Sequence, residues 1–249
     1  MQQGLTAEIA AADADPAARQ FAPLARVKHA WPWLAIGLAA YLLALIVTFP
    51  ARFVLGADPR WIVTGTVWTG EAVVDGAYRV QWRWAPWRSL ASLAFAADVR
   101  MTGNATDLAG SAMVSPGGTL LEGFAGSGDG GLLAAFGPAL PFACDSPLQI
   151  NLKRLRIAGP RSEAIGDIRS AAGSCTPLGG GQPNPVPALA TRLLPLPDGT
   201  TRIETAPIGR ERDHFFEGQI AGGRLHLTPT PAGIAALPFI RGLVIDESM

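Results

Sequence analysis

Few residues in this sequence have the types and spacing that chemistry needs, and the clearest pair is two cysteines. Cys144 and Cys175 are the only cysteines among the 249 residues, and both follow a long apolar segment. In an oxidising compartment such a pair predicts one disulfide, which closes a loop of about 30 residues and contributes roughly 3–4 kcal/mol. Two unrelated buried thiols are the alternative. A metal site would need more ligands than these two cysteines offer.

The histidines do not form a recognisable catalytic motif. His214 lies in RERDHFFEG between Asp213 and Glu217, which is typical of a solvated turn before a strand. His226 shares the polar side of a strand, RLHL, with Arg224. A Ser-His-Asp triad would need a supporting signature such as G-x-S-x-G, and Walker, H-E-x-x-H and EF-hand motifs are also absent from the sequence. We therefore expect a protein that is not an enzyme.

A glycine-rich segment imitates a cofactor motif. In GSGDGG, Gly126, Gly128 and Gly131 match G-x-G-x-x-G. A dinucleotide site also needs a buried strand before the glycines, a full helix after them and a βαβ unit around them. Here the following helix is barely two turns and the surroundings have the period of antiparallel strands. We expect a glycine-rich loop, with no cofactor-binding or metal site.

One apolar segment, residues 31–49, predicts a membrane-spanning helix. It has no charge over 19 residues and covers roughly 29 Å as a helix, close to the hydrocarbon thickness of a bilayer. Trp31 and Trp33 lie at one end, where interfacial aromatics are common. A buried core helix and a cleaved signal peptide are the alternatives. The run is longer than usual for a signal peptide, and no clean cleavage site follows it.

Charges near this segment predict its orientation. Arg19, Arg26 and Lys28 precede it, and Arg52 and Arg60 follow it. The short amino-terminal side is then cytoplasmic, and the chain after the segment is exported. The predicted organisation is a disordered cytoplasmic tail over 1–29, a signal-anchor helix in the bacterial inner membrane over 30–50, and a β-rich periplasmic domain over 51–249.

From residue 61 onward the apolar residues alternate with a period of two, which predicts strands. The segment AVVDGAYRVQWRW is interpreted as one half-buried antiparallel strand. Its apolar face carries Val74, Tyr78, Val80, Trp82 and Trp84, and its polar face carries Asp75, Ala77, Arg79, Gln81 and Arg83. The next strand, ASLAFAADVRM, has Leu93, Phe95, Ala97, Val99 and Met101 on its apolar face.

Later segments follow the same pattern. PLQINLKRLRIAG alternates through Leu148 to Leu152 and then slips to Leu155 and Ile157, as a β-bulge requires. Short helices are expected at 131–137 and 231–240. The Gly- and Pro-rich stretch 176–190 is expected to be a loop that separates two β-layers or two subdomains. The fold class is mainly β, either a curved antiparallel sheet or a sandwich. Further strand candidates are DLAGSAMVS, TLLEGFAG, TTRIETAP and HFFEGQIAGGRLHLTP.

Tryptophans and arginines are interleaved in residues 65–90. Trp82 and Trp84 share the apolar face and are expected in the core, while the arginines occupy the solvated face. Trp87 follows the break at Pro86 and is the aromatic expected to touch a partner or the membrane surface. Twenty basic and twenty acidic residues give no net charge, so nucleic acid is not an expected partner.

Residues 30–95 resemble the type II secretion system protein N family. FPARFV directly follows the apolar segment, and a G-T-[LVI]-W-x-G motif matches Gly65, Thr66, Val67, Trp68 and Gly70. A W-x-[WL]-x-P-x-x-L element then matches Trp82, Trp84 and Pro86, and Leu90 follows one residue after the position of its final leucine. After residue 100 the similarity is confined to strand length and rhythm. The cysteine pair is not part of the resemblance.

The resemblance implies an accessory inner-membrane subunit of the machine that moves folded proteins from the periplasm across the outer membrane. Its partners would be other secretion subunits, the outer-membrane channel or the secreted cargo. An exposed sheet edge near Trp68 and Trp87, with Arg88 beside it, is the expected docking surface. The alternative is a membrane-anchored periplasmic protein that binds or transfers lipid, which a long apolar groove would favour.

Overall fold

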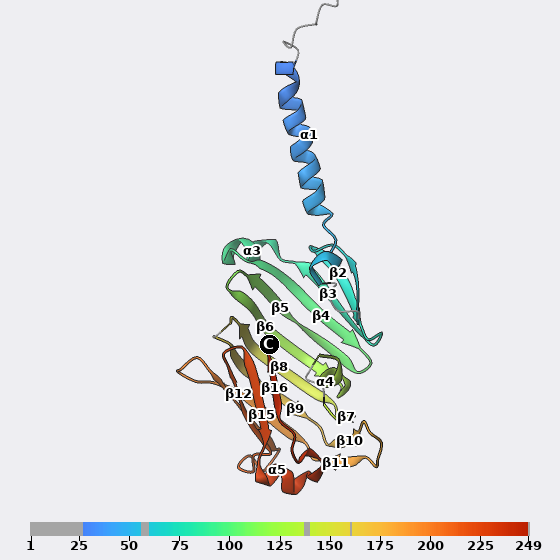
Figure 1. Ribbon diagram of the computed structural model, residues 1–249, viewed down its shortest axis with the longest axis vertical. Helices are drawn as coiled ribbons and strands as arrows, with labels where there is room; N and C mark the ends of the chain where they lie inside the picture. Colours follow the sequence, from blue (N-terminus) through green and yellow to red (C-terminus); the bar gives the residue numbers. More distant parts are fainter. Residues whose placement is uncertain (1–26, 56–59, 137–139, 160, 249) are drawn as a thin grey trace, which may run out of the picture. The chain divides into compact units, whose positions relative to one another are not determined.

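The computed structural model describes residues 27–55, 60–136, 140–159 and 161–248. The chain divides into two units, residues 1–47 and residues 48–249, and each is described by itself (Figure 1). Residues 1–26, which make up most of the predicted disordered tail, lie outside the described residues.

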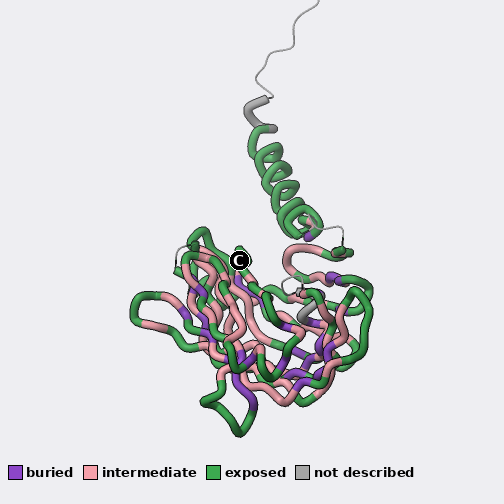
Figure 2. The backbone as a smooth tube through the Cα atoms, turned by 60° about the horizontal axis from the view of Figure 1, so that its bottom comes forward, coloured by how far each residue is buried: buried purple, intermediate pink, exposed green. Residues whose placement is uncertain are grey.

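The first unit contains one long helix, α1 (Val27–Val47), which has Pro32 in its first turns. Its side chains are exposed from residue 31 to residue 47, including Trp31 and Trp33 (Figure 2). In the part of the chain that the structure describes, no helix combines the length and the hydropathy that a membrane crossing requires.

The second unit is mainly β and is built on one large antiparallel sheet of thirteen strands. Neighbours in the sheet are consecutive in sequence except where β7, β10 and β11 leave it, so the sheet is a meander (Figure 1). Its strands are β1 (Trp61–Gly65), β2 (Thr69–Val74), β3 (Tyr78–Trp84), β4 (Phe95–Gly103), β5 (Thr106–Ser115), β6 (Gly118–Gly128), β8 (Leu148–Ile157), β9 (Glu163–Ser170), β12 (Leu189–Pro195), β13 (Thr201–Pro207), β14 (Phe216–Ala221), β15 (Arg224–Pro229) and β16 (Ile245–Ser248).

Smaller elements cover parts of this sheet. A second antiparallel sheet has three strands in the order β11-β10-β7, namely β11 (Asn184–Val186), β10 (Gly173–Pro177) and β7 (Phe142–Cys144). The helices of this unit are α2 (Arg52–Leu55), α3 (Pro86–Ser92), α4 (Gly131–Phe136), α5 (Pro231–Ala236) and the 3-10 turn η2 (Pro238–Ile240).

The alternation of apolar and polar residues gives the large sheet two different faces. Pairing aligns Val80 with Met101, Met101 with Leu108, and Ile150 with Ile168, so apolar residues from many strands fall on one face. The other face carries exposed ion pairs such as Arg79–Glu71 and Arg154–Glu122. Exposed pairs add little stability, so burial of the apolar face is the main stabilising term.

The buried residues form three clusters on the apolar face. The first joins Tyr78 and Leu108 to Leu132 of α4. The second joins Cys175 of the three-stranded sheet to Phe215 and to the carboxyl-terminal segment. The third lies between strands of the carboxyl-terminal half and contains Ala164, Ile203 and Ile220.

The segment predicted as one strand over residues 72–84 is a hairpin, and that prediction was wrong. β2 ends at Val74, β3 begins at Tyr78, and the two residues pair with each other. Asp75 and Gly76 have positive φ angles of 50° and 69°, as a tight hairpin turn requires. Val74 and Tyr78 still share one face, because they are an even number of residues apart, and both are buried. Trp84, which was expected in the core, is instead 36% exposed, because it lies at the end of β3 next to α3.

Leu93 is also misplaced by the prediction, which put it on the apolar face of the next strand. Pro86 occupies the first turn of α3, and Leu93 caps the end of that helix with a φ of 50°. The predicted loop 176–190 is partly strand, because β10 continues into it, β11 lies within it and β12 begins before its end. HFFEGQIAGGRLHLTP is the β14–β15 hairpin, with Gly222 and Gly223 at its turn.

Other predictions are confirmed. The pairing of β8 with β9 shifts between Leu152 and Arg154, where the slip in the sequence predicts a bulge. The two short helical segments form as α4 and as α5 followed by η2.

Candidate functional site

The residues of the two tryptophan motifs meet where β1 turns into β2 and β3 runs alongside. The indole Nε1 of Trp82 donates hydrogen bonds to the carbonyl oxygens of Thr66 (3.1 Å) and Val67 (3.2 Å). A Cβ atom on Gly70 would lie 2.2 Å from Cζ2 of this ring, so the close approach requires glycine. Gly65, at the start of the turn, has a φ of 90°. The motif residues therefore build one tightly packed turn.

A second layer of aromatic contacts joins this turn to α3. The rings of Trp68 and Trp84 meet edge to face with their centroids 4.8 Å apart. The indole Nε1 of Trp84 donates a hydrogen bond of 2.9 Å to Oγ of Ser89 in α3. Trp68 thus holds the turn to β3, and α3 is attached to the same corner of the sheet.

The outer side of α3 is an exposed apolar surface. Trp87, Leu90 and Leu93 expose 82%, 66% and 89% of their area, and we call these three residues the α3 patch. Arg88 forms an ion pair with Asp98 at 2.9 Å, and both side chains are largely exposed. Of the predicted interaction residues, Trp68 is therefore packed inside the corner, Arg88 is paired within the chain, and Trp87 faces outward.

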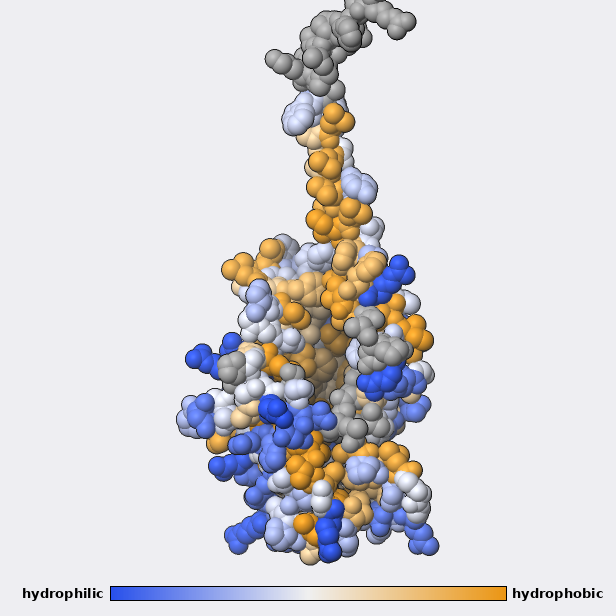
Figure 3. All heavy atoms as spheres, viewed as in Figure 1, coloured by the Kyte–Doolittle hydropathy of each residue, from blue (hydrophilic) through white to orange (hydrophobic). Residues whose placement is uncertain are grey.

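A second candidate site is a cavity of about 360 Å³ in the carboxyl-terminal half of the sheet, which we call the apolar chamber. Leu148 and Ile168 from β8 and β9 line it together with Leu225, Leu227 and Ile245 from β15 and β16, so the sheet curls round until these strands face one another. Figure 3 shows the face of the molecule hollowed at its centre, with hydrophobic residues on the walls of the hollow.

None of the described residues that line the chamber is charged. Three of its polar members already have hydrogen-bond partners: the hydroxyls of Thr191 and Thr205 lie 2.8 Å apart, and Oγ of Ser170 accepts from the backbone N–H of Leu189. The described buried side chains have no unpaired nitrogen or oxygen atom. Such a wall can hold a hydrocarbon, whereas a charged or peptide-like group would lose its hydration without compensation.

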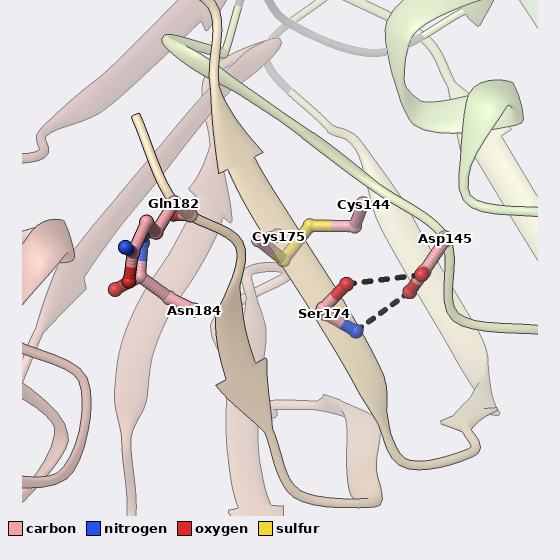
Figure 4. Close-up of a disulfide and its surroundings, with 6 residues drawn as sticks. All are labelled: Cys144, Asp145, Ser174, Cys175, Gln182 and Asn184. Carbon is pink, nitrogen blue, oxygen red and sulfur yellow. Dashed lines mark hydrogen bonds between the residues drawn. A yellow bond between two sulfur atoms is a disulfide. The ribbon is translucent and has the colours of Figure 1, made fainter. Parts of the chain in front are cut away.

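The disulfide forms part of the chamber wall. Cys144 of β7 and Cys175 of β10 are paired in register and are bonded, as predicted (Figure 4). Beside the bond, the carboxylate of Asp145 accepts from the backbone N–H (2.6 Å) and the hydroxyl (3.0 Å) of Ser174. These hydrogen bonds, the backbone one first, lower the pKa of Asp145 below its ordinary value.

A third depression, of about 680 Å³, lies over β1 to β5. Its lining includes Glu71, Gln81, Arg83, Asp98 and Arg100. Glu71 accepts from Gln81 and from Arg79, which together lower its pKa, and Arg100 is paired with Asp107. Because these charges largely satisfy one another at the solvated surface, the depression has the character of a polar sheet face.

Tyr78 is the titratable group that burial affects most clearly. Its hydroxyl donates a hydrogen bond of 2.5 Å to Oδ1 of Asp129, which precedes α4. Burial, and then this hydrogen bond, raises the pKa of Tyr78 far above its ordinary value. The pair fastens α4 to β3 and lies within the first core cluster.

His214 and His226 make ordinary polar contacts. Nδ1 of His214 lies 2.9 Å from Glu217, and His226 is close to Asp246 on the polar face, beside Arg224 as predicted. The expected glycine-rich loop is wrong for Gly126 and Gly128, because both pair with neighbouring strands as part of β6. α4 after them has six residues. Within the described residues, no three His, Cys, Asp or Glu side chains are grouped as metal ligands.

The sequence did not predict the chamber. Its walls come from strands that are far apart in the chain, and from Phe239, Ile240 and Leu243 near the carboxyl terminus. The alternation of each strand gave the face on which these residues lie, but not the void between them.

Comparison of the chain with protein-family models, curated proteins and solved structures finds no match.

Proposed function

We propose that this protein is a non-enzymatic accessory subunit of the type II secretion system, which exports folded proteins from the periplasm across the outer membrane. One observation carries the proposal. The residues that match the two motifs of the protein N family form a single packed corner, in which Trp82 lies over Gly70 and Trp68 lies against Trp84. This packing supports reading the two motifs as one structural unit.

The proposal includes an anchor in the inner membrane, with the amino terminus in the cytoplasm. Its support is the uncharged run over residues 31–49 and the exposure of the large apolar side chains along α1, among them Leu34, Leu38 and Leu42. Such a surface is unstable in water and is stable in hydrocarbon. The domain that follows residue 50 would then be periplasmic, where its disulfide persists.

The contact surface that we propose is the α3 patch together with the edge of the large sheet at β1. Trp87 offers a large exposed ring, and tryptophan is frequent at the centres of interfaces. β1 is the terminal strand in the order of the sheet. The segment before it already bonds to Gly65 and bridges Thr66, so a partner's strand would pair with the other end of β1. The partners are other secretion subunits, the outer-membrane channel or the cargo.

Deletion of the gene tests this function, followed by fractionation of folded exoproteins between the periplasm and the medium. We expect exoproteins to accumulate in the periplasm, and the intact chain to restore secretion. A chain without residues 61–249 should not restore it. The Trp87→Ala chain should restore it poorly, whereas Leu178→Ala, at another largely exposed apolar residue (69%, against 82% for Trp87), should restore it fully. Normal secretion in the deletion strain would contradict the proposal.

A second candidate function is lipid binding or transfer in the envelope. The uncharged lining of the apolar chamber favours it. In this case the deletion strain would secrete normally and its envelope lipid composition would change.

A further inference from the structure

We propose that the apolar chamber binds one acyl chain of a membrane lipid, with the lipid headgroup outside in solvent. This inference rests on the lipid-binding candidate, and it adds the site and the part of the lipid that enters it. It does not depend on a role in secretion.

The size and lining of the chamber define the ligand class. Its volume of about 360 Å³ falls within the range of small-molecule sites, roughly 300–1,000 Å³. Leu193, Leu225 and Leu227 line it and are only partly buried, although they pack against a core cluster. Covering this remaining apolar surface with hydrocarbon would be favourable, at about 25 cal/mol per Å².

The hydrogen-bonding groups of the chamber lining favour an acyl chain over a polypeptide. A peptide segment in the chamber would bring backbone N–H and C=O groups that need partners. The threonine hydroxyls of the lining, on Thr191 and Thr205, already bond each other, and Ser170 already bonds Leu189. An acyl chain has no such groups, so it can fill the chamber without an unpaired polar atom.

One wall of the chamber is held together by contacts that can keep a narrow ligand in place. The ring of Phe239, after α5, meets the ring of Phe142 of β7 edge to face at 5.4 Å. The Cys144–Cys175 bond fixes β7 to β10. The wall opposite the large sheet is thus a small cross-linked sheet joined to the carboxyl-terminal segment.

The test is photolabelling of the full chain in lipid nanodiscs with a diazirine derivative of palmitate, followed by peptide mapping. We expect labelled peptides from β15, β16 and the segment 237–245, in addition to labelling of residues 31–49 by bulk lipid. The variant Leu227→Trp, which fills the chamber, should reduce labelling of the chamber at least tenfold while leaving the label on residues 31–49 unchanged. Ile208→Trp, at an exposed residue outside the chamber, is the matched control.

Labelling confined to residues 31–49, or chamber labelling that Leu227→Trp does not change, would overturn the proposal. Displacement of the probe by an apolar peptide as effectively as by unlabelled palmitate would also overturn it. Circular dichroism verifies that each variant is folded, and Leu193→Trp, on another strand of the lining, replaces Leu227→Trp if that chain unfolds. Labelling decides the site, whereas the lipid composition of the deletion strain decides the second candidate function.

Discussion

The indole ring of Trp82 lies so close to Gly70 that a single methyl group on residue 70 would overlap it. The two residues are on neighbouring strands and are paired directly in the register of β2 and β3. The same ring donates to the carbonyl oxygens of Thr66 and Val67 in the turn before Gly70, so the contact fixes the turn and the strands together.

Gly70→Ala should therefore destabilise the domain by about 1–3 kcal/mol, because the added methyl group overpacks the ring of Trp82. Urea unfolding of the full chain, followed by tryptophan fluorescence, measures the change. Gly179→Ala is the matched control, because nothing lies within 4 Å of the position of its Cβ atom. Equal stability of the two variants would show that the Trp82 ring moves away from the added methyl group without losing free energy of folding.

Reduction of the Cys144–Cys175 bond should lower the free energy of unfolding by roughly 3–4 kcal/mol, as expected for a loop of the observed separation of 31 residues. Thermal unfolding with and without dithiothreitol gives the difference. The double variant Cys144→Ser, Cys175→Ser should match the reduced protein and should not respond to dithiothreitol. An oxidised protein no more stable than this variant would contradict the role of the bond.

Tyr78 should remain protonated in the folded protein at pH values where free tyrosine ionises. Because its folded pKa is raised, its contribution to stability is fully present below the unfolded pKa of about 10 and is lost as the pH rises further. A Tyr41→Phe chain, in which Tyr78 is the sole tyrosine, should show no tyrosinate absorbance at pH 10 to 11 until it unfolds. Ionisation of half of the Tyr78 hydroxyls near pH 10 while the protein is still folded would contradict this prediction.

Tyr78→Phe should destabilise the domain by about 1–3 kcal/mol, because the carboxylate of Asp129 then loses the hydroxyl that it accepts from. Chemical unfolding at pH 7 measures this loss. Tyr41→Phe should leave the stability of the domain unchanged. A Tyr78→Phe chain as stable as this control would show that solvent replaces the hydrogen bond.

The faces of the strands could be predicted from the alternation of apolar and polar residues, because this alternation stays in phase even where a strand boundary was predicted wrongly. The hairpin at Asp75 and Gly76 was missed for the same reason, since a turn that pairs Val74 with Tyr78 leaves the alternation in phase. The bulge in β8 was predicted because it changes that phase. Leu93 was misplaced because Pro86 starts a helix where the pattern suggested only a break.

The candidate sites were harder to predict than the strands. Trp87 was expected at the surface because it follows the break at Pro86, and it is exposed there. The chamber depends on how far the sheet curls and on where the carboxyl-terminal segment lies. The alternation of apolar residues within one strand predicts neither. Sequence alone therefore could not distinguish a filled core from a void between Leu148 and Leu227.

The account as a whole depends on Trp87 as a contact with another envelope protein. Trp87→Ala should change the free energy of unfolding by less than about 0.5 kcal/mol, because the ring is exposed and packs against little. Any loss of secretion in this variant would then reflect a lost contact rather than an unfolded domain.

The most direct measurement is crosslinking in living cells with a photoreactive amino acid placed at residue 87, with residue 178 as the control position. The account predicts a crosslink from residue 87 to a protein of the secretion system, and none from residue 178. Crosslinks from residue 87 to lipid alone, or the same products from both positions, would contradict it.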